Sequence, residues 1–307
     1  MDGYVEQSTE RRRLICEQAE EQLDLPAASL EKDYWVCWTL RELFGIPDWG
    51  QIITFKGGTS LSKCWSLINR FSEDIDIVID KGFLGFAGEE SPEEAPSRKQ
   101  KKKRLDAMRK AAQGKIHDDL APALEARIGA SLPSSDTWEL SPASENEDRD
   151  RQTLLFKYPS AMANTEAYVP RVVKIEMGAR SDNEPVEEKE VHAYLFDAFP
   201  DVLGPSKFRV RALAAERTFW EKASVCLVIV SAVIALIHWI DWNYYFQSSI
   251  KWLKVFVEIS QVFNTLFRDT RDLYCGSEIW FLIGCAILLS FMIFDKYVIM
   301  PWRSGSS

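Results

Sequence analysis

The chain has 307 residues, enough to bury one large core or two smaller ones, and a formal net charge of −9. This acidic balance argues against a generally basic surface that binds nucleic acid. It is still compatible with a local basic groove. Six scattered cysteines without a Cys-x-x-Cys pair, and three dispersed histidines, indicate reduced thiols and argue against a zinc site or a histidine metal cluster.

The N-terminal part of the chain reads as helical. Apolar residues at helical intervals predict helices over residues 7–24 and 30–45. The turn between them contains Pro26, and Ser29 is the expected N-cap of the second helix. The first residues are acidic and polar rather than basic and apolar, so no secretory signal is expected there.

Residues 50–80 carry the most informative pattern. They predict two strands, at 50–55 and 74–79, separated by a Gly-Gly-Thr-Ser turn and a short helix. Asp74 and Asp76 are two residues apart in the second strand, so their side chains point to the same face. Two carboxylates placed in this way can reach one divalent ion together.

The turn has the residue types that a phosphate-binding segment needs. Gly57 and Gly58 lack Cβ atoms, which lets the backbone approach a ligand closely. Thr59 and Ser60 open a helix expected over 61–68, whose N-terminus favours an anion. A turn, one helix and paired carboxylates on a strand together fit the transfer of a group from a nucleoside triphosphate.

The middle of the chain alternates loops and elements. Residues 82–98 and 131–152 read as loops, and a basic run at 99–104 opens a helix expected to continue to about residue 129. This run is either a solvated helix face or a patch that contacts the phosphates of RNA. The expected strands that follow are 153–158, 171–178, 190–196 and 207–213.

Glu176 is the third acidic candidate. In the strand at 171–178, Lys174, Glu176 and Gly178 share one face, while the apolar residues share the other. Glu176 would face the Asp74 and Asp76 pair if its strand lies beside theirs. The residues alone do not decide between this role and that of an ordinary surface acid.

These segments resemble the AbiEii/AbiGii toxin nucleotidyltransferases, which belong to the polymerase-β-like nucleotidyltransferase superfamily. The resemblance covers about residues 10–224, and its motifs are 31–36 with 40–44, 56–63, 70–76, 172–178 and 216–222. It implies an Mg²⁺-dependent nucleotidyltransferase that uses two ions. The implied catalytic residues are Asp74, Asp76, Glu176 and Lys222, of which the three acids hold the metal.

The resemblance also implies partners and a context. Gly57, Gly58, Thr59, Ser60 and Ser72 are the implied nucleotide- and phosphate-binding residues. The implied substrate is a nucleoside triphosphate, the acceptor an RNA such as a tRNA 3′ end, and the partner a cognate antitoxin. Such enzymes act in toxin–antitoxin or abortive-infection systems of phage defence.

After Lys222 the chain becomes strongly apolar. Residues 223–307 contain equal numbers of basic and acidic residues, so the whole net charge belongs to residues 1–222. Two long uncharged runs, each flanked by Trp and Tyr, predict a membrane hairpin at about 225–246 and 279–300. The alternative is a very apolar helical subdomain that stays outside the membrane.

The expected fold class is therefore α+β, with a mixed sheet flanked by helices and followed by an apolar helical region. The domains expected are a nucleotidyltransferase domain at 1–224 and a hydrophobic region at 225–307. We expect a cytoplasmic catalytic domain tethered to the bacterial inner membrane. The alternative function is a membrane-acting effector whose nucleotidyltransferase-like domain senses nucleotides or is inactive.

Overall fold

A computed structural model describes residues 1–68, 74–162, 170–181, 183–203, 207–221 and the single residues 228, 230 and 231. The chain divides into two compact units, Met1–Thr218 and Phe219–Ser307, and nearly all described residues belong to the first unit. Among the described residues, no helix combines the length and the apolarity needed to cross a membrane. Apart from 228, 230 and 231, both expected membrane spans lie outside the described residues.

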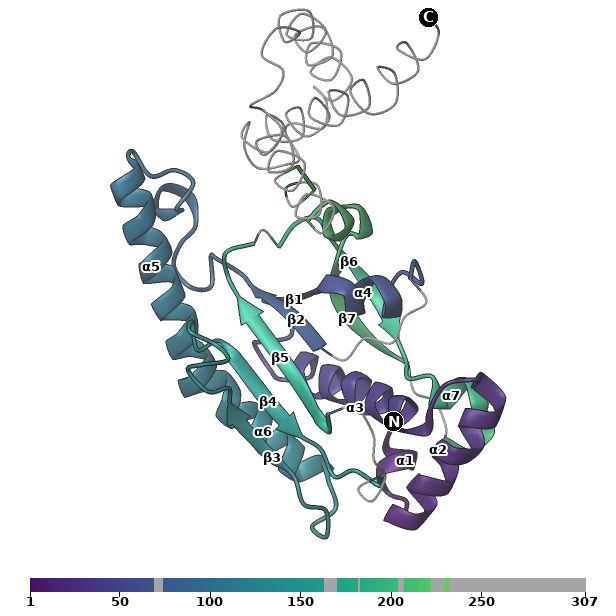
Figure 1. Ribbon diagram of the computed structural model, residues 1–307. Helices are drawn as coiled ribbons and strands as arrows, with labels where there is room; N and C mark the ends of the chain where they lie inside the picture. The colour runs from purple at the N-terminus through teal and green to yellow at the C-terminus, as the bar shows by residue number, and fades with distance from the viewer. Residues whose placement is uncertain are drawn as a thin grey trace, which may run out of the picture. The chain divides into compact units, whose positions relative to one another are not determined.

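The first unit is a mixed α+β fold, which confirms the expected class (Figure 1). Its helices are α1 (Asp2–Val5), α2 (Thr9–Leu23), α3 (Ala27–Phe44), α4 (Gly57–Lys63), α5 (Arg98–Lys115), α6 (Ala121–Ser131), α7 (Leu195–Ala198) and α8 (Pro200–Leu203), with a 3₁₀ turn at Gly88–Glu90 and a π turn at Ile116–Leu120. Its strands are β1 (Ile53–Lys56), β2 (Asp74–Ile79), β3 (Glu139–Pro142), β4 (Thr153–Lys157), β5 (Val172–Gly178), β6 (Val186–Val191) and β7 (Phe208–Leu213).

The seven strands of the described residues form one sheet in the order β3-β4-β5-β2-β1-β7-β6. The inner pairs β2–β5 and β1–β7 are parallel, whereas β1–β2 and the outer pairs are antiparallel. The two strands that carry Asp74, Asp76 and Glu176 are therefore neighbours near the middle of the sheet.

One face of the sheet is apolar and packs on α3. Alternate residues of β2 and β5, such as Ile75 and Ile175, are fully buried, because side chains alternate between the two faces of a strand. Helix α3 is buried along most of its length, and its Trp38 stacks on Phe156 of β4 at a centroid distance of 5.9 Å. The polar residues of the same strands consequently lie on the opposite face.

Four local expectations differ from the structure. The loop expected at 131–152 contains strand β3 (Glu139–Pro142). Helix α3 begins at Ala27 with Pro26 as its N-cap, so Ser29 lies inside the helix. Helix α4 begins at Gly57 rather than after the turn. The strand expected at 190–196 ends at Val191 as β6, and residues 195–198 form α7 instead.

Candidate active site

The register of three strands brings the acidic candidates together. In the antiparallel pair β1–β2, Lys56 is opposite Asp76. In the parallel pair β2–β5, Asp76 is level with Glu176, and Asp74 is level with Lys174. Residues paired in this way project from the same face of a sheet, so all five side chains share the face opposite the apolar core. Glu176 was expected to face the aspartates if its strand lies beside theirs, and β5 does lie beside β2.

Gly57, which directly follows β1, packs against the Asp76 side chain. Its φ is +80°, which favours glycine. A Cβ atom at Gly57 would stand 1.8 Å from Asp76 Oδ2 and 2.6 Å from Asp76 Cγ. The missing side chain therefore gives room to the Asp76 carboxylate, in addition to any room that it gives a phosphate. Gly57 and Asp76 form one packed unit.

The hydroxyls of the turn bind the protein itself. Thr59 is 1% exposed, and its Oγ1 donates to the carbonyl oxygen of Asp74, which fixes α4 to the first residue of β2. Ser60 is fully buried and donates to the Gly57 carbonyl at 2.9 Å. Helix α4 has only seven residues, so its dipole is small. A phosphate at this turn would have to rely on backbone N–H groups and nearby cations.

Lys174 is a cation that the sequence reasoning placed on this face without giving it a role. Its Nζ lies 2.5 Å from Glu176 Oε1. The hydrogen bond to Glu176 raises the pKa of Lys174, partial burial opposes this, and the charges of Glu176 and Asp74 add to the rise. Lys174 is therefore a firmly charged ammonium beside the carboxylates. The signal for this pair was present in the i, i+2 spacing of Lys174 and Glu176.

The residues fit a magnesium ion through two carboxylates. Asp74 and Asp76 are both partly exposed on one face, and Mg²⁺ typically binds one or two carboxylates together with substrate phosphates. Glu176 is adjacent, but its carboxylate contacts Lys174. In the described part of the chain, no group of three or more His, Cys, Asp or Glu side chains is arranged to hold a metal ion. The aspartate pair is thus the part of the site that suits the ion.

A buried ion pair holds α4 in place. Lys63, at the end of α4, pairs with Asp33 of α3, and the two side chains are 6% and 2% exposed. Burial opposes the charge on Lys63, but the Asp33 carboxylate outweighs burial and raises the pKa of Lys63. Asp33 also accepts a hydrogen bond of 2.8 Å from the Tyr194 backbone N–H, and Lys63 Nζ lies 3.4 Å from the Tyr194 ring centre. Sequence reasoning missed this pair, because Asp33 and Lys63 lie thirty residues apart.

Two expected site residues are outside the described structure. Lys222 follows a helical segment described over residues 215–221 and is itself outside the described residues. Ser72 lies in the segment 69–73, which is also outside them. Their roles remain expectations.

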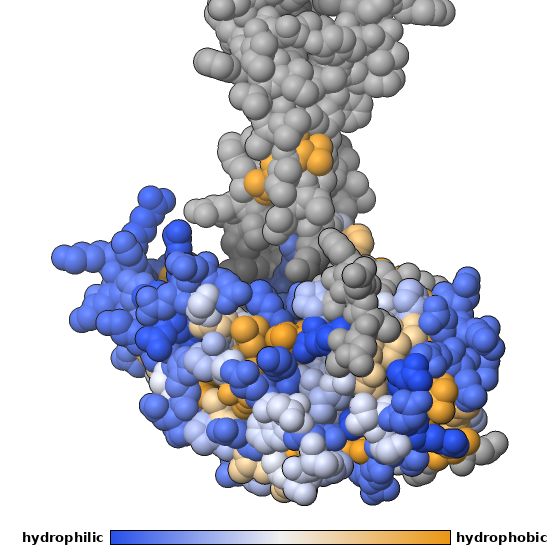
Figure 2. All heavy atoms as spheres, turned by 60° about the horizontal axis from the view of Figure 1, so that its bottom comes forward, coloured by the Kyte–Doolittle hydropathy of each residue, from blue (hydrophilic) through white to orange (hydrophobic). Residues whose placement is uncertain are grey.

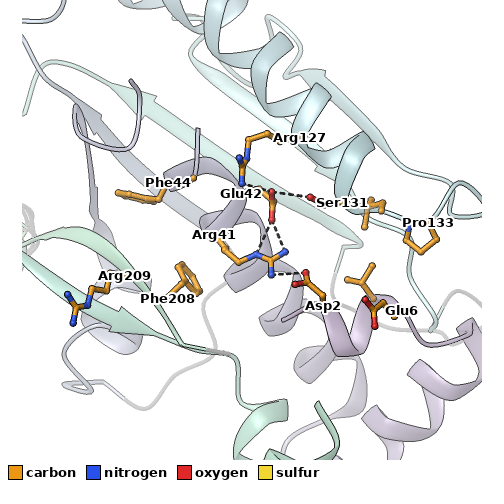
Figure 3. A pocket seen from close by; sticks show the side chains of 13 residues that line it. Asp2, Glu6, Arg41, Glu42, Phe44, Arg127, Ser131, Pro133, Phe208 and Arg209 are labelled. Atoms are coloured by element: carbon orange, nitrogen blue, oxygen red, sulfur yellow. Dashed lines mark hydrogen bonds and ion pairs between the residues drawn. The ribbon is translucent and has the colours of Figure 1, made fainter. Parts of the chain in front are cut away.

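A cavity of about 650 Å³ lies near the end of the strands that is opposite to the carboxylates (Figure 3). Phe208, the first residue of β7, lines the cavity. The carboxylates lie instead near the last residues of the parallel strands β1 and β7. At its base the buried Glu42 pairs with Arg41 at 2.7 Å and with Arg127 at 3.1 Å. The Glu42–Arg127 pair joins α3 to α6.

Comparisons with known proteins identify the family of the chain. A family model described as nucleotidyl transferase AbiEii toxin, type IV TA system, matches residues 38–251. The match begins and ends later in the chain than the limits of about 10 and 224 expected from the sequence, so it includes part of the apolar region. No curated protein matches the chain.

Among solved structures, the chain is similar to MenT4, a nucleotidyltransferase toxin from Mycobacterium tuberculosis H37Rv. The two are 18% identical with a TM-score of 0.36, and the alignment covers 72% of this chain and 63% of that one. This chain therefore spans less than two thirds of the length of MenT4.

Proposed function

The chain belongs to the AbiEii family of nucleotidyltransferase toxins of toxin–antitoxin systems, and from this premise we propose that it transfers a nucleoside monophosphate from a nucleoside triphosphate to an acceptor hydroxyl. The observation that carries the proposal is the strand register that sets Asp76 level with Glu176 and opposite Lys56, with Asp74 on the same face. A polar, charged face at the centre of a sheet otherwise contributes little to folding, because exposed ion pairs stabilise weakly.

We assign the donor triphosphate to the turn at Gly57–Ser60, beside the aspartate pair. Asp74 and Asp76 would bind Mg²⁺, and Glu176 would complete the site if its carboxylate leaves Lys174. Bound Mg²⁺ would neutralise charge on the phosphates and orient them. Lys174 and Lys56 supply positive charge on the same face. Ser72 and Lys222 are proposed as further contacts of the triphosphate.

The reaction is a displacement at the α-phosphorus. The acceptor oxygen forms a bond to this phosphorus, and the bond from the phosphorus to the oxygen bridging to the β-phosphate breaks. Pyrophosphate leaves with that oxygen, and the acceptor proton passes to solvent. The chain's contribution is to hold donor and acceptor in line and to balance the charge that develops on the leaving pyrophosphate.

For the acceptor we propose an RNA, with a tRNA 3′ end as the first candidate, and for the partner a cognate antitoxin. Both follow from the family and not from the geometry. We place the catalytic unit in the cytoplasm, where nucleoside triphosphates and RNA are available, and regard residues 225–307 as a tether to the inner membrane.

The test is transfer of label to total RNA from each of the four α-³²P-labelled nucleoside triphosphates in turn. We expect the full chain to label RNA with Mg²⁺ present, and Asp76→Asn to abolish labelling while retaining the fold. Glu188→Gln, in an exposed carboxylate of the outer strand β6, is the control and should retain full labelling. Equal labelling by the wild type and Asp76→Asn would refute the proposal.

A further inference from the structure

Helix α5 carries a concentrated positive charge in an acidic protein. Its sequence from Arg98 to Arg104 contains six basic residues and no acidic one, although the whole chain has a net charge of −9. Residues 98–103 are all exposed. Figure 2 shows hydrophilic side chains projecting on the left of the molecule, where Figure 1 places α5.

Helix stability does not explain this charge. Cations at a helix N-terminus oppose the helix dipole, which favours acidic residues in the first turn, and α5 has none there. The helix start is instead held by Ser97, whose Oγ accepts from the Gln100 N–H at 3.2 Å. Arg104 further binds the carbonyl oxygens of Glu89 and Ser91, at 2.5 and 2.8 Å. The exposed lysines are thus displayed on an anchored helix at a cost to its stability.

The lysines form a stripe along one side of α5. Lys99, Lys103 and Lys110 follow helical spacing, and with Lys102, Asp106 and Ala107 they line a shallow hollow of about 430 Å³, so four lysines and one acidic residue face it. From Lys99 to Lys110 the stripe extends about 16 Å along the helix axis, at 1.5 Å per residue. A row of cations of this length matches several successive phosphates of one nucleic-acid strand.

The C-terminal end of the stripe is tied to the strands of the candidate active site. The backbone carbonyl of Arg109, next to Lys110, accepts a hydrogen bond of 3.2 Å from Gln152 Nε2, and the Arg109 guanidinium pairs with Asp150 at 2.9 Å. Gln152 precedes Thr153, which is level with Glu176 in the β4–β5 pair. A polyanion lying along the stripe therefore has one end beside the strand of Glu176.

We propose that the lysine stripe of α5 binds the phosphate backbone of the acceptor RNA and leads its reactive end toward the aspartate pair. The inference rests on the proposed function, because the direction of the stripe has meaning only if an RNA is the acceptor. An acidic protein partner could pair with the lysines equally well, but its binding would not depend on the contacts that join α5 to the strands of the candidate active site.

The experiment measures binding, not catalysis, on the full chain. Fluorophore-labelled bulk tRNA, poly(U) and poly-glutamate are titrated over a series of salt concentrations. The stripe variant is Lys99→Gln/Lys103→Gln/Lys110→Gln, and the control, Arg11→Gln/Lys101→Gln/Lys207→Gln, removes three exposed charges that lie off the stripe. A third variant replaces the three stripe lysines with Arg and keeps the charge.

We expect the stripe variant to lose affinity and its log–log salt slope to fall by about 2, which corresponds to three lost phosphate contacts on a single strand. The control and the Arg variant should bind as the wild type does. Equal slopes and affinities for the stripe variant and the control would overturn the inference. So would a larger loss of binding to poly-glutamate than to RNA, which would indicate an acidic protein partner.

The two proposals fail separately. If the wild type transfers no label but the stripe variant loses RNA binding, the proposed function is wrong and the stripe stands. If the wild type labels RNA and the stripe variant binds RNA as tightly as the control, the stripe is wrong and the proposed function stands.

Discussion

Gly57 and Asp76 are packed so closely that a single methyl group on Gly57 would approach Asp76 Oδ2 to 1.8 Å. The turn at the end of β1 and the carboxylate on β2 are therefore placed by one contact. Any residue other than glycine at position 57 must move the carboxylate, the turn or both.

Gly57→Ala should consequently lower RNA labelling by about a hundredfold or more, as expected for a displacement near 1 Å at a reacting centre. The matched control is Gly85→Ala, because Gly85 has a φ of +83° but no heavy atom within 4 Å of the position that a Cβ atom would take. Both changes should cost about 1–2 kcal/mol of stability through the left-handed backbone. Activity and melting temperature are measured together, and similar activity losses for both variants would contradict the steric explanation.

Much of the site was predictable because it depends on local alternation. The i, i+2 spacing of Asp74 and Asp76, and the position of Glu176 in an alternating strand, specify which side chains share a face. The approach of Asp76 to Gly57 and the buried Lys63–Asp33 pair were not predictable. They depend on which strands and helices become neighbours, and no local pattern encodes that.

The missed elements have related causes. Strand β3 (Glu139–Pro142), at the sheet edge, has only four residues and none of them is fully buried, so no apolar alternation marks it. The other edge strand, β6, is Glu-rich and was placed several residues too late. An edge strand is held by hydrogen bonds to a single neighbouring strand, so its own sequence shows only a weak strand pattern.

In the proposed function, Lys174 would compete with Mg²⁺ for the Glu176 carboxylate, because its Nζ lies 2.5 Å from Glu176 Oε1. Lys174→Met should lower the Mg²⁺ concentration needed for half-maximal labelling several-fold, because Glu176 becomes available as a ligand. The pair is 37% and 43% exposed, so the free energy of unfolding should change by less than about 1 kcal/mol. Lys207→Met, in an exposed pair with Glu190, serves as the control. An unchanged Mg²⁺ requirement would argue against Glu176 as a metal ligand.

The buried pair Lys63–Asp33 should be costly to break from one side. Asp33→Asn leaves the Lys63 ammonium buried without its counter-charge, and we expect a loss of about 3–5 kcal/mol in unfolding free energy. Lys115→Met, in a pair 45% exposed on both sides, should cost less than about 1 kcal/mol. Denaturant titration followed by tryptophan fluorescence measures both, and equal losses would contradict the burial argument.

Cys64 directly follows Lys63, whose positive charge acts to lower the pKa of the Cys64 thiol, so the reactivity of this thiol can report on the same pair. Burial raises the pKa of the Cys64 thiol from 9.0 to about 12, so near pH 8 its reactive thiolate should be about a thousandfold rarer than for an exposed cysteine. Alkylation of Cys64 by iodoacetamide should therefore be slow in the wild type and should speed up as the pH rises toward 12. At each pH below 12 it should be faster in Asp33→Asn than in the wild type. Peptide mass spectrometry gives the rate, and rapid labelling of the folded wild type would contradict the prediction.

The apolar C-terminal region is expected from its sequence to insert into a membrane. The uncharged runs 223–240 and 279–294 should hold the full chain in the membrane fraction after an alkaline carbonate wash. A lysine near the centre of each expected span (225–246 and 279–300), Leu236→Lys with Leu288→Lys, should release the chain, since each charge costs about 2.5–3.5 kcal/mol in insertion. Lysine substitutions at the exposed Leu14 and Leu67 of the first unit are the control and should leave the chain in the membrane. If the washed wild type is found in the soluble fraction, the apolar region is a helical subdomain outside the membrane, and the tether is excluded.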